Sequence, residues 1–470
     1  MKTKNPSHYQ SLFEGLQVLT PTLDGSKLRY INFDNAASTP PLKSVLKAVN
    51  DFSVYYSSVH RGTGFKSQLS THAYEQARQI TLQFVGADPK THTCIFGKNT
   101  TEAINKLARR FPFTPTHDIL LTTAMEHHSN DLPWRVNPNV KVVHIKTTTN
   151  GCLNMDDYQS KLSEYAQRIA LVAVSGASNV TGYLNPIYEM AEQAHAVGAH
   201  FAADTAQLAP HREINMLPLT DPRHLDYVTL SAHKMYAPFG TGALIGRRDI
   251  FSQGTPDLVG GGTVSIVTLE DVVWAEAPER DEAGSPNVIG AVALAAAIKT
   301  LEEIGMDAVA AHEAELTTHA LDRLSDIDGL EIYGCTDPQN AENRLGVIPL
   351  NLKGKSHYLV AAILGHEFGI GVRNGCFCAH PYLLDLMKVT ESEAGQVRES
   401  ILEGDRSNIP GLVRVSFGLY NTIAEVDAVV DALKKVAMGE YKGDYVQDIT
   451  TGEFTPRGWE PEFEEYFGEL

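Results

Sequence analysis

The central part of the chain alternates short apolar runs with stretches in which apolar residues recur at helical spacing. The apolar runs predict strands at 93–96, 118–122, 140–145, 169–174, 200–203, 227–230 and 242–246, and the helical spacing predicts helices at about 72–84, 101–110 and 186–197. Several runs are apolar throughout, as is typical of strands covered on both faces. The alternation predicts an α/β domain with a large, mostly parallel sheet.

The pattern changes after about residue 286. Two helical stretches rich in Ala, Leu and Glu fill 286–325, and strand-like segments near 330–333, 346–351 and 411–417 then mix with helices near 356–366 and 422–435. Thr422 and Glu425 have the spacing of a capping box, which predicts where the last helix begins. This mixture predicts a smaller α+β domain. We expect an N-terminal extension of the small domain at 1–30, a large domain at 31–300, the small domain at 301–437, and an acidic tail at 438–470 that is either docked or partly loose.

Composition narrows the functional classes. The chain has 470 residues, 43% of them hydrophobic, and a formal net charge of −18. This acidic balance argues against nucleic acid as a main partner, because phosphate binding requires a basic surface. No run approaches the roughly 20 apolar residues of a membrane helix, and the N-terminus has no apolar signal region. Five scattered cysteines do not form a disulfide framework, so we expect a cytoplasmic protein.

Two charged residues follow predicted strands. Asp204 ends one apolar run, and Lys234 follows another within a turn of small residues. Taken alone, Lys234 could be solvated and Asp204 could be a helix cap. Together at the carboxyl edge of an open sheet, where such folds bind ligands, they are the pair that pyridoxal phosphate requires. The lysine holds the aldehyde, and the carboxylate keeps the ring nitrogen protonated.

Two further segments also follow strands. The stretch GKNTTE at 97–102 opens a helix, so its backbone N–H groups and the hydroxyls of Thr100 and Thr101 can face a phosphate, although threonine caps are common. His127 could stack on a cofactor ring or be an ordinary satisfied polar group. The agreement of these signals at the ends of several strands of one sheet favours a cofactor site.

The stretch RNGCFCAH at 373–380 contains Cys376 and Cys378. A disulfide between them would close a very strained ring, and a zinc site would need a second ligand cluster that the sequence lacks. Two alternatives are left: a small side chain packed in the core, which is the default for a free cysteine, and a thiolate nucleophile.

The chain resembles the class V, fold-type I pyridoxal-phosphate enzymes, and among them the group II cysteine desulfurases and selenocysteine lyase-like enzymes. The resemblance is carried, in family order, by DNAA (34–37), VHRG (59–62), NTTEAIN (99–105), MEHH (125–128), SNVTG (178–182), DTAQ (204–207), SAHK (231–234), GGG (260–262), EAGSPN (282–287), RxGxxC (373–378) and RVSFGLYN (414–421). GCFC at 375–378 also resembles the amino-terminal domain of molybdenum cofactor sulfurases. The implied fold is a large domain with a mostly parallel sheet and a smaller α+β domain.

The resemblance implies a role for each matching residue. In the cofactor site, Lys234 would hold pyridoxal 5'-phosphate covalently, Asp204 would pair with its ring nitrogen, Gln207 with its phenolic oxygen, His127 would stack on the ring, and Thr100, Thr101, Ser231 and His233 would hold the phosphate. In the substrate site, Asn179 and Arg414 would bind the amino acid's carboxylate, with Arg373, His60 and Arg61 nearby. Lys234 would act as the general base, and Cys378 would take sulfur from the substrate as a persulfide, with release of alanine.

The resemblance also implies a homodimer and a sulfur-acceptor protein. One departure concerns the segment after the triple glycine, where the family usually supplies a threonine to the partner subunit's cofactor. Here Val267 stands in that register, with Thr263, Ser265 and Thr268 nearby, and Ala232 replaces a common glycine. Two rival functions are considered: a C–S lyase, kynureninase-like hydrolase or epimerase that does not need Cys378, and a binding protein with a degenerate site. The presence of Lys234, Asp204 and the phosphate-binding hydroxyls disfavours the second.

Overall fold

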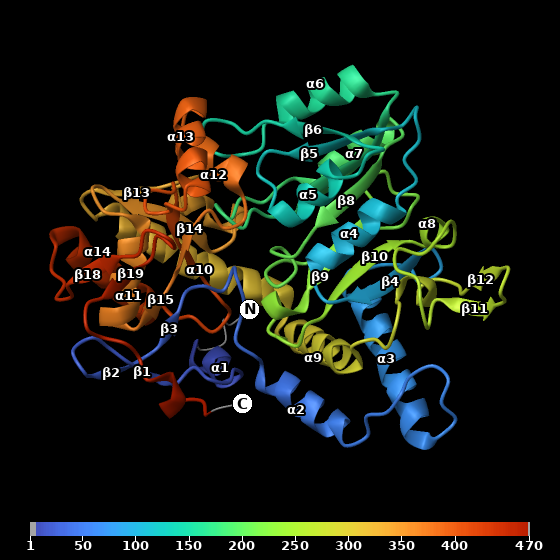
Figure 1. Cartoon of the computed structure of the whole chain (residues 1–470), viewed down its shortest axis with the longest axis horizontal. Coiled ribbons are helices and arrows are strands. Elements are labelled where there is room, and N and C mark those ends of the chain that lie inside the picture. Colours follow the sequence, from blue (N-terminus) through green and yellow to red (C-terminus); the bar gives the residue numbers. More distant parts are fainter. Residues whose placement is uncertain (1–5, 469–470) are drawn as a thin grey trace.

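The computed structural model describes residues 6–468, and a seven-stranded sheet forms the centre of its larger lobe (Figure 1). The strands are β4 (His92–Gly97), β5 (Ile119–Thr123), β6 (Lys141–Ile145), β7 (Ile169–Ser175), β8 (His200–Asp204), β9 (Tyr227–Ser231) and β10 (Gly242–Arg247), in the order β4-β10-β9-β8-β7-β5-β6. Each overlaps a strand expected from an apolar run. Only β10 runs in the direction opposite to the other strands of this sheet, so the expectation of a mostly parallel sheet is confirmed.

The sheet is covered on both faces, which explains why its strands lack alternation. Leu121 of β5 lies in the larger hydrophobic cluster, whereas Leu120 lies in a second cluster on the opposite face. The helices of this lobe are α2 (Lys43–Ser53), α3 (Phe65–Phe84), α4 (Thr100–Arg110), α5 (Leu132–Arg135), α6 (Met155–Tyr165), α7 (Ile187–Ala196), α8 (Arg248–Phe251) and α9 (Val288–Ile304), with 3-10 turns η1 (His128–Asn130), η2 (Ala232–Lys234) and η3 (Glu279–Asp281).

Helices α3, α4 and α7 match the three expected from helical spacing in this region, whereas α2 and α6 were not expected. Only Tyr158 and Leu162 of α6 are buried, so its apolar repeat is too sparse to stand out in the sequence. The start of α6 is fixed by its N-cap residue Asn154, whose side chain accepts the N–H of Asp157.

The smaller lobe is built on an antiparallel sheet in the order β13-β14-β17-β16. Its elements are α10 (Met306–Ser325), β13 (Leu330–Ile332), η4 (Pro338–Asn343), β14 (Val347–Leu352), α11 (His357–Phe368), β15 (Ile370–Gly371), β16 (Arg373–Gly375), α12 (His380–Leu386), α13 (Glu391–Leu402), β17 (Leu412–Ser416) and α14 (Ile423–Met438). The capping box of Thr422 and Glu425 is confirmed at the start of α14. Helix α13 was not expected, because none of its residues is buried and it therefore has no apolar face.

The N-terminal segment pairs with the smaller lobe through its last strand, and Phe13 also packs against Tyr236 of the larger lobe. It comprises α1 (Pro6–Ser11), β1 (Leu19–Pro21), β2 (Lys27–Arg29) and β3 (Ile31–Asn32). Strand β3 pairs in parallel with β15, and Phe33 lies in the smaller lobe's hydrophobic cluster. The division of the chain at residues 30, 300 and 437 stays a prediction.

The acidic tail is docked along 442–459, whereas Phe463 and Phe467 near its end are exposed. Its strands β18 (Tyr445–Gln447) and β19 (Phe454–Pro456) form a hairpin, followed by η5 (Phe463–Glu465). Glu367 of α11 accepts hydrogen bonds from the backbone of Lys442 and Gly443 and from the Tyr445 hydroxyl, at 2.9, 2.9 and 3.0 Å. Within residues 6–468, no helix has both the length and the apolar character needed to cross a membrane.

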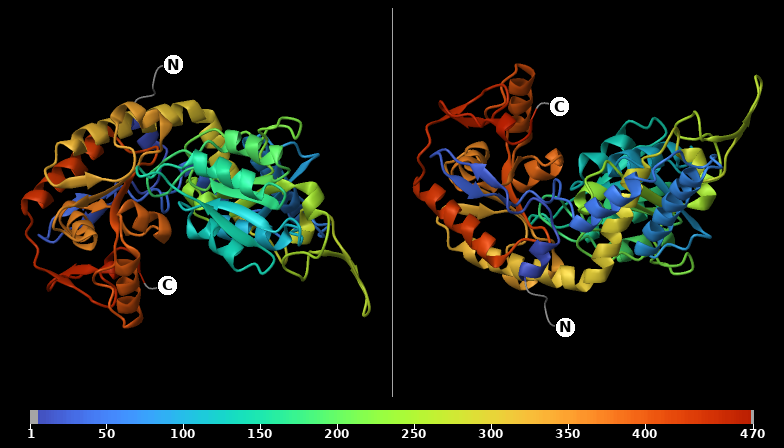
Figure 2. Two further views of the ribbon diagram at one scale, coloured as in Figure 1. Left: turned by 90° about the horizontal axis from the view of Figure 1, so that it is seen from above. Right: turned by 90° about the horizontal axis from the view of Figure 1, so that it is seen from below.

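A second hairpin, β11 (Val264–Val267) with β12 (Val272–Trp274), projects from the far end of the larger lobe (Figure 2). Its apolar side chains include Ile266, Val267, Leu269 and Val273, and about half or more of each is exposed. Such a concentration of exposed apolar residues on one projection is unusual for a monomer surface.

Candidate active site

A pocket opens at the carboxyl ends of strands β7, β8 and β9 and is completed by the smaller lobe. From the large sheet and its loops it is lined by Thr100, Thr101, His127, Asn179, Asp204, Gln207, Ser231, His233 and Lys234, and from the smaller lobe by Arg373, Cys378 and Arg414. These are all of the site residues expected from the sequence except His60 and Arg61. The fold therefore joins segments from both lobes into a single site.

Lys234 follows β9 in the turn η2, and its ammonium group lies inside the pocket. Its Nζ is 3.3 Å from Oε1 of Gln207. Burial lowers the pKa of Lys234 to about 8, although Asp204 nearby favours the charged form. A lysine with this pKa exchanges a proton readily near neutral pH, which suits both a nucleophilic amine and a general base.

Asp204 is the last residue of β8 and is buried. Its Oδ1 accepts the backbone N–H of Ala206 at 3.0 Å. Burial raises the pKa of Asp204, while that hydrogen bond and Lys234 act in the opposite direction. Burial removes water from around the carboxylate. A cationic ring nitrogen beside it would stabilise the negative charge in its place.

The N-terminus of α4 forms a corner suited to an anion. Asn99 caps the helix by accepting the N–H of Glu102, and the N–H of Thr100 donates to Oγ of Ser231 at 2.9 Å. The buried Oγ1 of Thr100 has no hydrogen-bond partner among the described residues, although a buried hydroxyl normally has one. An unsatisfied hydroxyl at a helix N-terminus fits a phosphate group.

His127 is held in one tautomer by its neighbours. Its Nδ1 accepts the backbone N–H of Ser129 at 3.1 Å, so the proton of the neutral ring lies on Nε2. Burial, reinforced by Lys234, lowers the pKa of His127 to about 3. The ring is therefore neutral at physiological pH, and a neutral imidazole can stack on a flat ligand.

Arg414 of β17 is buried and engages the larger lobe. Its guanidinium donates to the carbonyl of Asn179 at 2.9 Å and to Oδ1 of Asp34 at 3.1 Å, and Arg373 lies 3.6 Å from the other oxygen of Asp34. Burial lowers the pKa of Arg414 to about 10, so it stays charged at neutral pH. Asp34 thus occupies part of the fork that a substrate carboxylate would use.

Cys378 lies exposed on a loop with an uncommon backbone. Phe377 and Cys378 both have positive φ, 53° and 55°, which costs side-chain-bearing residues about 1–2 kcal/mol each. Two contacts hold this conformation: Asn179 donates its side-chain N–H to the carbonyl of Phe377, and His128 donates its backbone N–H to the carbonyl of Cys378, each at 2.7 Å. The thiol is thereby presented to the pocket.

Cys376 differs from Cys378 in its surroundings. It is half-buried against a hydrophobic cluster that includes Phe377 and Tyr382, and burial raises the pKa of its thiol. All five cysteines lie outside disulfides. A packed, less acidic thiol is a poor nucleophile.

His60 and Arg61 lie apart from the pocket. They line a separate hollow with Gly261, Gly262 and Ser265. The guanidinium of Arg61 donates to the backbone carbonyl at the start of β11, at 3.1 Å. The structure therefore does not bring these two residues to the pocket of their own chain.

The hydroxyls near the triple glycine differ in their exposure. Thr263 is buried and donates to the carbonyl of Gly260, and Thr268 accepts the N–H of Asp271 within the hairpin turn. Ser265 is exposed, and its hydroxyl lies 3.4 Å from a backbone carbonyl of β12. Of the three hydroxyls, that of Ser265 is therefore the most available to another molecule.

Several residues of the site carry no assignment from the sequence. Asp34, Glu126 and His128 lie within the matching motifs, whereas Ser129 and Phe377 stand beside or between their defining positions. Each acts through a contact with a residue distant in the chain or through its own backbone, and no local pattern marks such contacts. Position inside or beside the motifs is the one signal that points to them.

The comparisons with known proteins agree with this geometry. Residues 31–429 match the family model described as Aminotransferase class-V. A probable cysteine desulfurase of Halalkalibacterium halodurans is 35% identical over 91% of this chain and 97% of its own length, and a cysteine desulfurase of Haloferax volcanii is 33% identical over 87% and 89%. An apo cysteine desulfurase structure from Thermococcus onnurineus NA1 superposes with a TM-score of 0.74 at 33% identity, covering 87% of this chain and 95% of that one.

Proposed function

The chain belongs to the class V aminotransferase family, and we propose that it is a cysteine desulfurase that uses pyridoxal 5'-phosphate. The observation that carries the proposal is the exposed Cys378, which lines the same pocket as Lys234 and Asp204. A lyase or aminotransferase would need the lysine and the aspartate but not a cysteine presented to the pocket.

The residues present fit the cofactor. Lys234 would hold it, Asp204 would face its ring nitrogen, and the unsatisfied hydroxyl of Thr100, with Thr101, Ser231 and His233, would hold the phosphate. Burial lowers the pKa of His233 to about 4, so this ring donates as a neutral group. When bound, pyridoxal phosphate supplies an aldehyde that reacts with amines and a ring that accepts electrons.

The substrate's charged groups have matching partners. The buried fork of Arg414, with the side chain of Asn179, would bind the α-carboxylate, which would take the place that Asp34 holds beside Arg414. Lys234, with its lowered pKa, would remove the proton from the α-carbon at Nζ and return a proton when the product forms.

Cys378 would accept the sulfur. Its thiolate attacks the sulfur of L-cysteine, an S–S bond forms, the substrate's C–S bond breaks, and the carbon is protonated. The products are alanine and a persulfide on Cys378, so atoms and electrons balance without a further oxidant. The exposure of Cys378 would then let an acceptor protein collect the sulfur.

We also propose a homodimer. A partner subunit would bury the exposed apolar side chains of the β11–β12 hairpin. His60, Arg61 and Ser265 line a hollow beside the hairpin rather than the pocket of their own chain. In a dimer these residues would complete the partner's site, with Ser265 as the hydroxyl that replaces the expected threonine.

The test is to compare Cys378→Ala with the matched variant Cys376→Ala. With L-cysteine and a thiol reductant, Cys376→Ala should form alanine and sulfide at rates near those of the parent, whereas Cys378→Ala should form neither. Mass spectrometry of the parent should find a gain of about 32 Da, one sulfur, on the peptide that contains Cys378. Unchanged turnover in Cys378→Ala would refute the desulfurase mechanism and favour a lyase, hydrolase or epimerase.

A further inference from the structure

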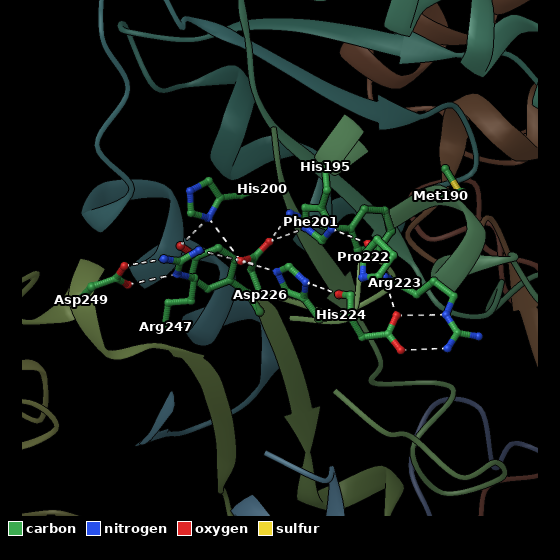
Figure 3. Close-up of polar contacts among 12 residues, drawn as sticks. Met190, His195, His200, Phe201, Pro222, Arg223, His224, Asp226, Arg247 and Asp249 are labelled. Atoms are coloured by element: carbon green, nitrogen blue, oxygen red, sulfur yellow. Dashed lines mark hydrogen bonds and ion pairs between the residues drawn. The ribbon is translucent and has the colours of Figure 1, made fainter. Parts of the chain in front are cut away.

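His195, His224 and Asp226 form a cluster (Figure 3) beside the amino ends of β8 and β9, whereas the pocket lies at the carboxyl ends of these strands. His195 is near the end of α7, and His224 and Asp226 lie in the loop before β9. Nε2 of His195 is 3.0 Å from one carboxylate oxygen of Asp226, and Nε2 of His224 is 3.4 Å from the other. The three ligand atoms all lie within 4.8 Å of one another.

Hydrogen bonds fix both imidazole rings. Nδ1 of His195 is 2.7 Å from the carbonyl of Pro222, and Nδ1 of His224 is 2.7 Å from the carbonyl of Asp221. A carbonyl oxygen only accepts, so each Nδ1 carries a proton. In the neutral rings, both Nε2 lone pairs therefore face a carboxylate that has no proton to offer.

This arrangement needs positive charge between the rings and the carboxylate. Protonation of both rings would supply it, but the rings are stacked with centroids 3.9 Å apart and planes 11° apart, so two charged rings would repel each other. Arg247 also contributes a cation 3.3 Å from Asp226, although Asp249 pairs with the same guanidinium at 2.5 Å.

We propose that His195, His224 and Asp226 bind a divalent transition-metal ion such as Zn²⁺. Two imidazole nitrogens and one carboxylate oxygen are a common zinc ligand set, and a fourth position can be taken by water. Histidine ligands usually donate their second ring N–H to a carbonyl, as both rings do here. Asp226 also accepts the N–H of Phe201 at 2.8 Å, and Nδ1 of His200 lies 3.5 Å from it.

The ion would stabilise the fold and would take no part in the reaction. Strand β8 begins at His200 beside the cluster and ends at Asp204 in the pocket, so at about 3.3 Å per residue the two sites are roughly 13 Å apart. The ion would join α7 to the loop before β9, the strand that leads to Lys234, and Asp226 also holds the start of β8 through the N–H of Phe201. The side chains of His195 and His224 are 16% and 10% exposed, so solvent reaches the site.

The test is zinc binding to tag-free holoenzyme in a Cys378→Ala background, which removes the pocket thiol. Zinc affinity is measured by competition with a chromophoric chelator. The double variant His195→Gln/His224→Gln should lose more than about 100-fold in affinity for one Zn²⁺ equivalent, since it lacks two ligands. The matched control His72→Gln/His117→Gln changes two exposed histidines and should bind as the parent does. Equal binding by both double variants, or no binding by the parent, would overturn the proposal.

A second measurement covers the case in which the double variant misfolds. Co²⁺ bound by nitrogens and oxygens in tetrahedral geometry absorbs in the visible region, away from the cofactor band, and gives no thiolate charge-transfer band. The single variant His195→Ala, at a partly exposed position, should lose this spectrum while keeping the parent's circular dichroism. A folded His195→Ala protein with an unchanged cobalt spectrum would refute the site.

Discussion

Glu126 is a buried carboxyl group whose replacement by Gln should lower stability at low pH but not at high pH. Its Oε1 accepts from the Thr123 hydroxyl and the Ser175 N–H at 2.6 and 3.0 Å. Its Oε2 contacts the Ser175 hydroxyl and the Asn130 amide at 2.6 and 2.7 Å. Burial raises the pKa of Glu126 to about 7, despite these hydrogen bonds.

The sign follows from proton linkage. Below about pH 4.5 the group is protonated in both the folded and unfolded states. Between about pH 4.5 and 7 the unfolded chain ionises while the folded one holds its proton, so stability falls as pH rises. At about 1.36 kcal/mol per pH unit, the full loss is about 3 kcal/mol above pH 7.

Gln does not titrate, but its amide would face the Asn130 amide, which costs about 1–3 kcal/mol at every pH. Glu126→Gln should therefore be less stable than the parent near pH 5 and equal to it or more stable near pH 8, with a change of about 2–3 kcal/mol in the difference. Thermal unfolding of the cofactor-free proteins at both pH values measures it, with the exposed Glu164→Gln as control. A difference in melting temperature that does not vary with pH would refute the reasoning.

Three further outcomes are expected. Arg414→Lys keeps the charge but loses the fork, so kcat/KM for L-cysteine should fall at least about thirtyfold, or about 2 kcal/mol, and an unchanged value would exclude Arg414 as the carboxylate ligand. Gly242→Ala would place a Cβ 2.6 Å from the Asn99 backbone and should raise the Kd of the cofactor in a fluorescence titration, whereas Gly365→Ala, which meets open space, should not. Ile266→Lys with Val273→Lys should give a monomer in analytical ultracentrifugation, while Leu402→Lys on α13 should not; a dimer in the first variant would contradict the proposed interface.

Much of the large lobe could be predicted because strands buried on both faces appear in the sequence as runs of consecutive apolar residues. The seven apolar runs became the seven strands, and, as expected, Asp204 ends one strand and Lys234 lies in the turn after another. The antiparallel direction of β10 could not be predicted, because an apolar run has the same composition in either direction. Helix α13 was missed for the opposite reason, since it buries nothing.

The polar contacts of the pocket could not be predicted from local sequence patterns. Arg414 meets Asp34 across 380 positions of sequence, and no local periodicity reports such a pair. The placement of Cys378 depends on left-handed backbone at Phe377 and Cys378. Neither Phe nor Cys is typical of turns, so these two residues give no local signal of this conformation. The family resemblance named the residues, but the forces that position them arise only in the folded chain.

The left-handed backbone at Phe377 and Cys378 also limits which amino acids evolution can place there. Side chains branched at Cβ are strongly disfavoured at positive φ, so Val, Ile and Thr are excluded even where their volume would fit. Gly or Asn at 377 would relax the loop, at the cost of the aromatic ring that lies 4.6 Å from the Arg414 guanidinium. The permitted substitutions at position 378 are therefore set by backbone shape as well as by the chemistry proposed for its thiol.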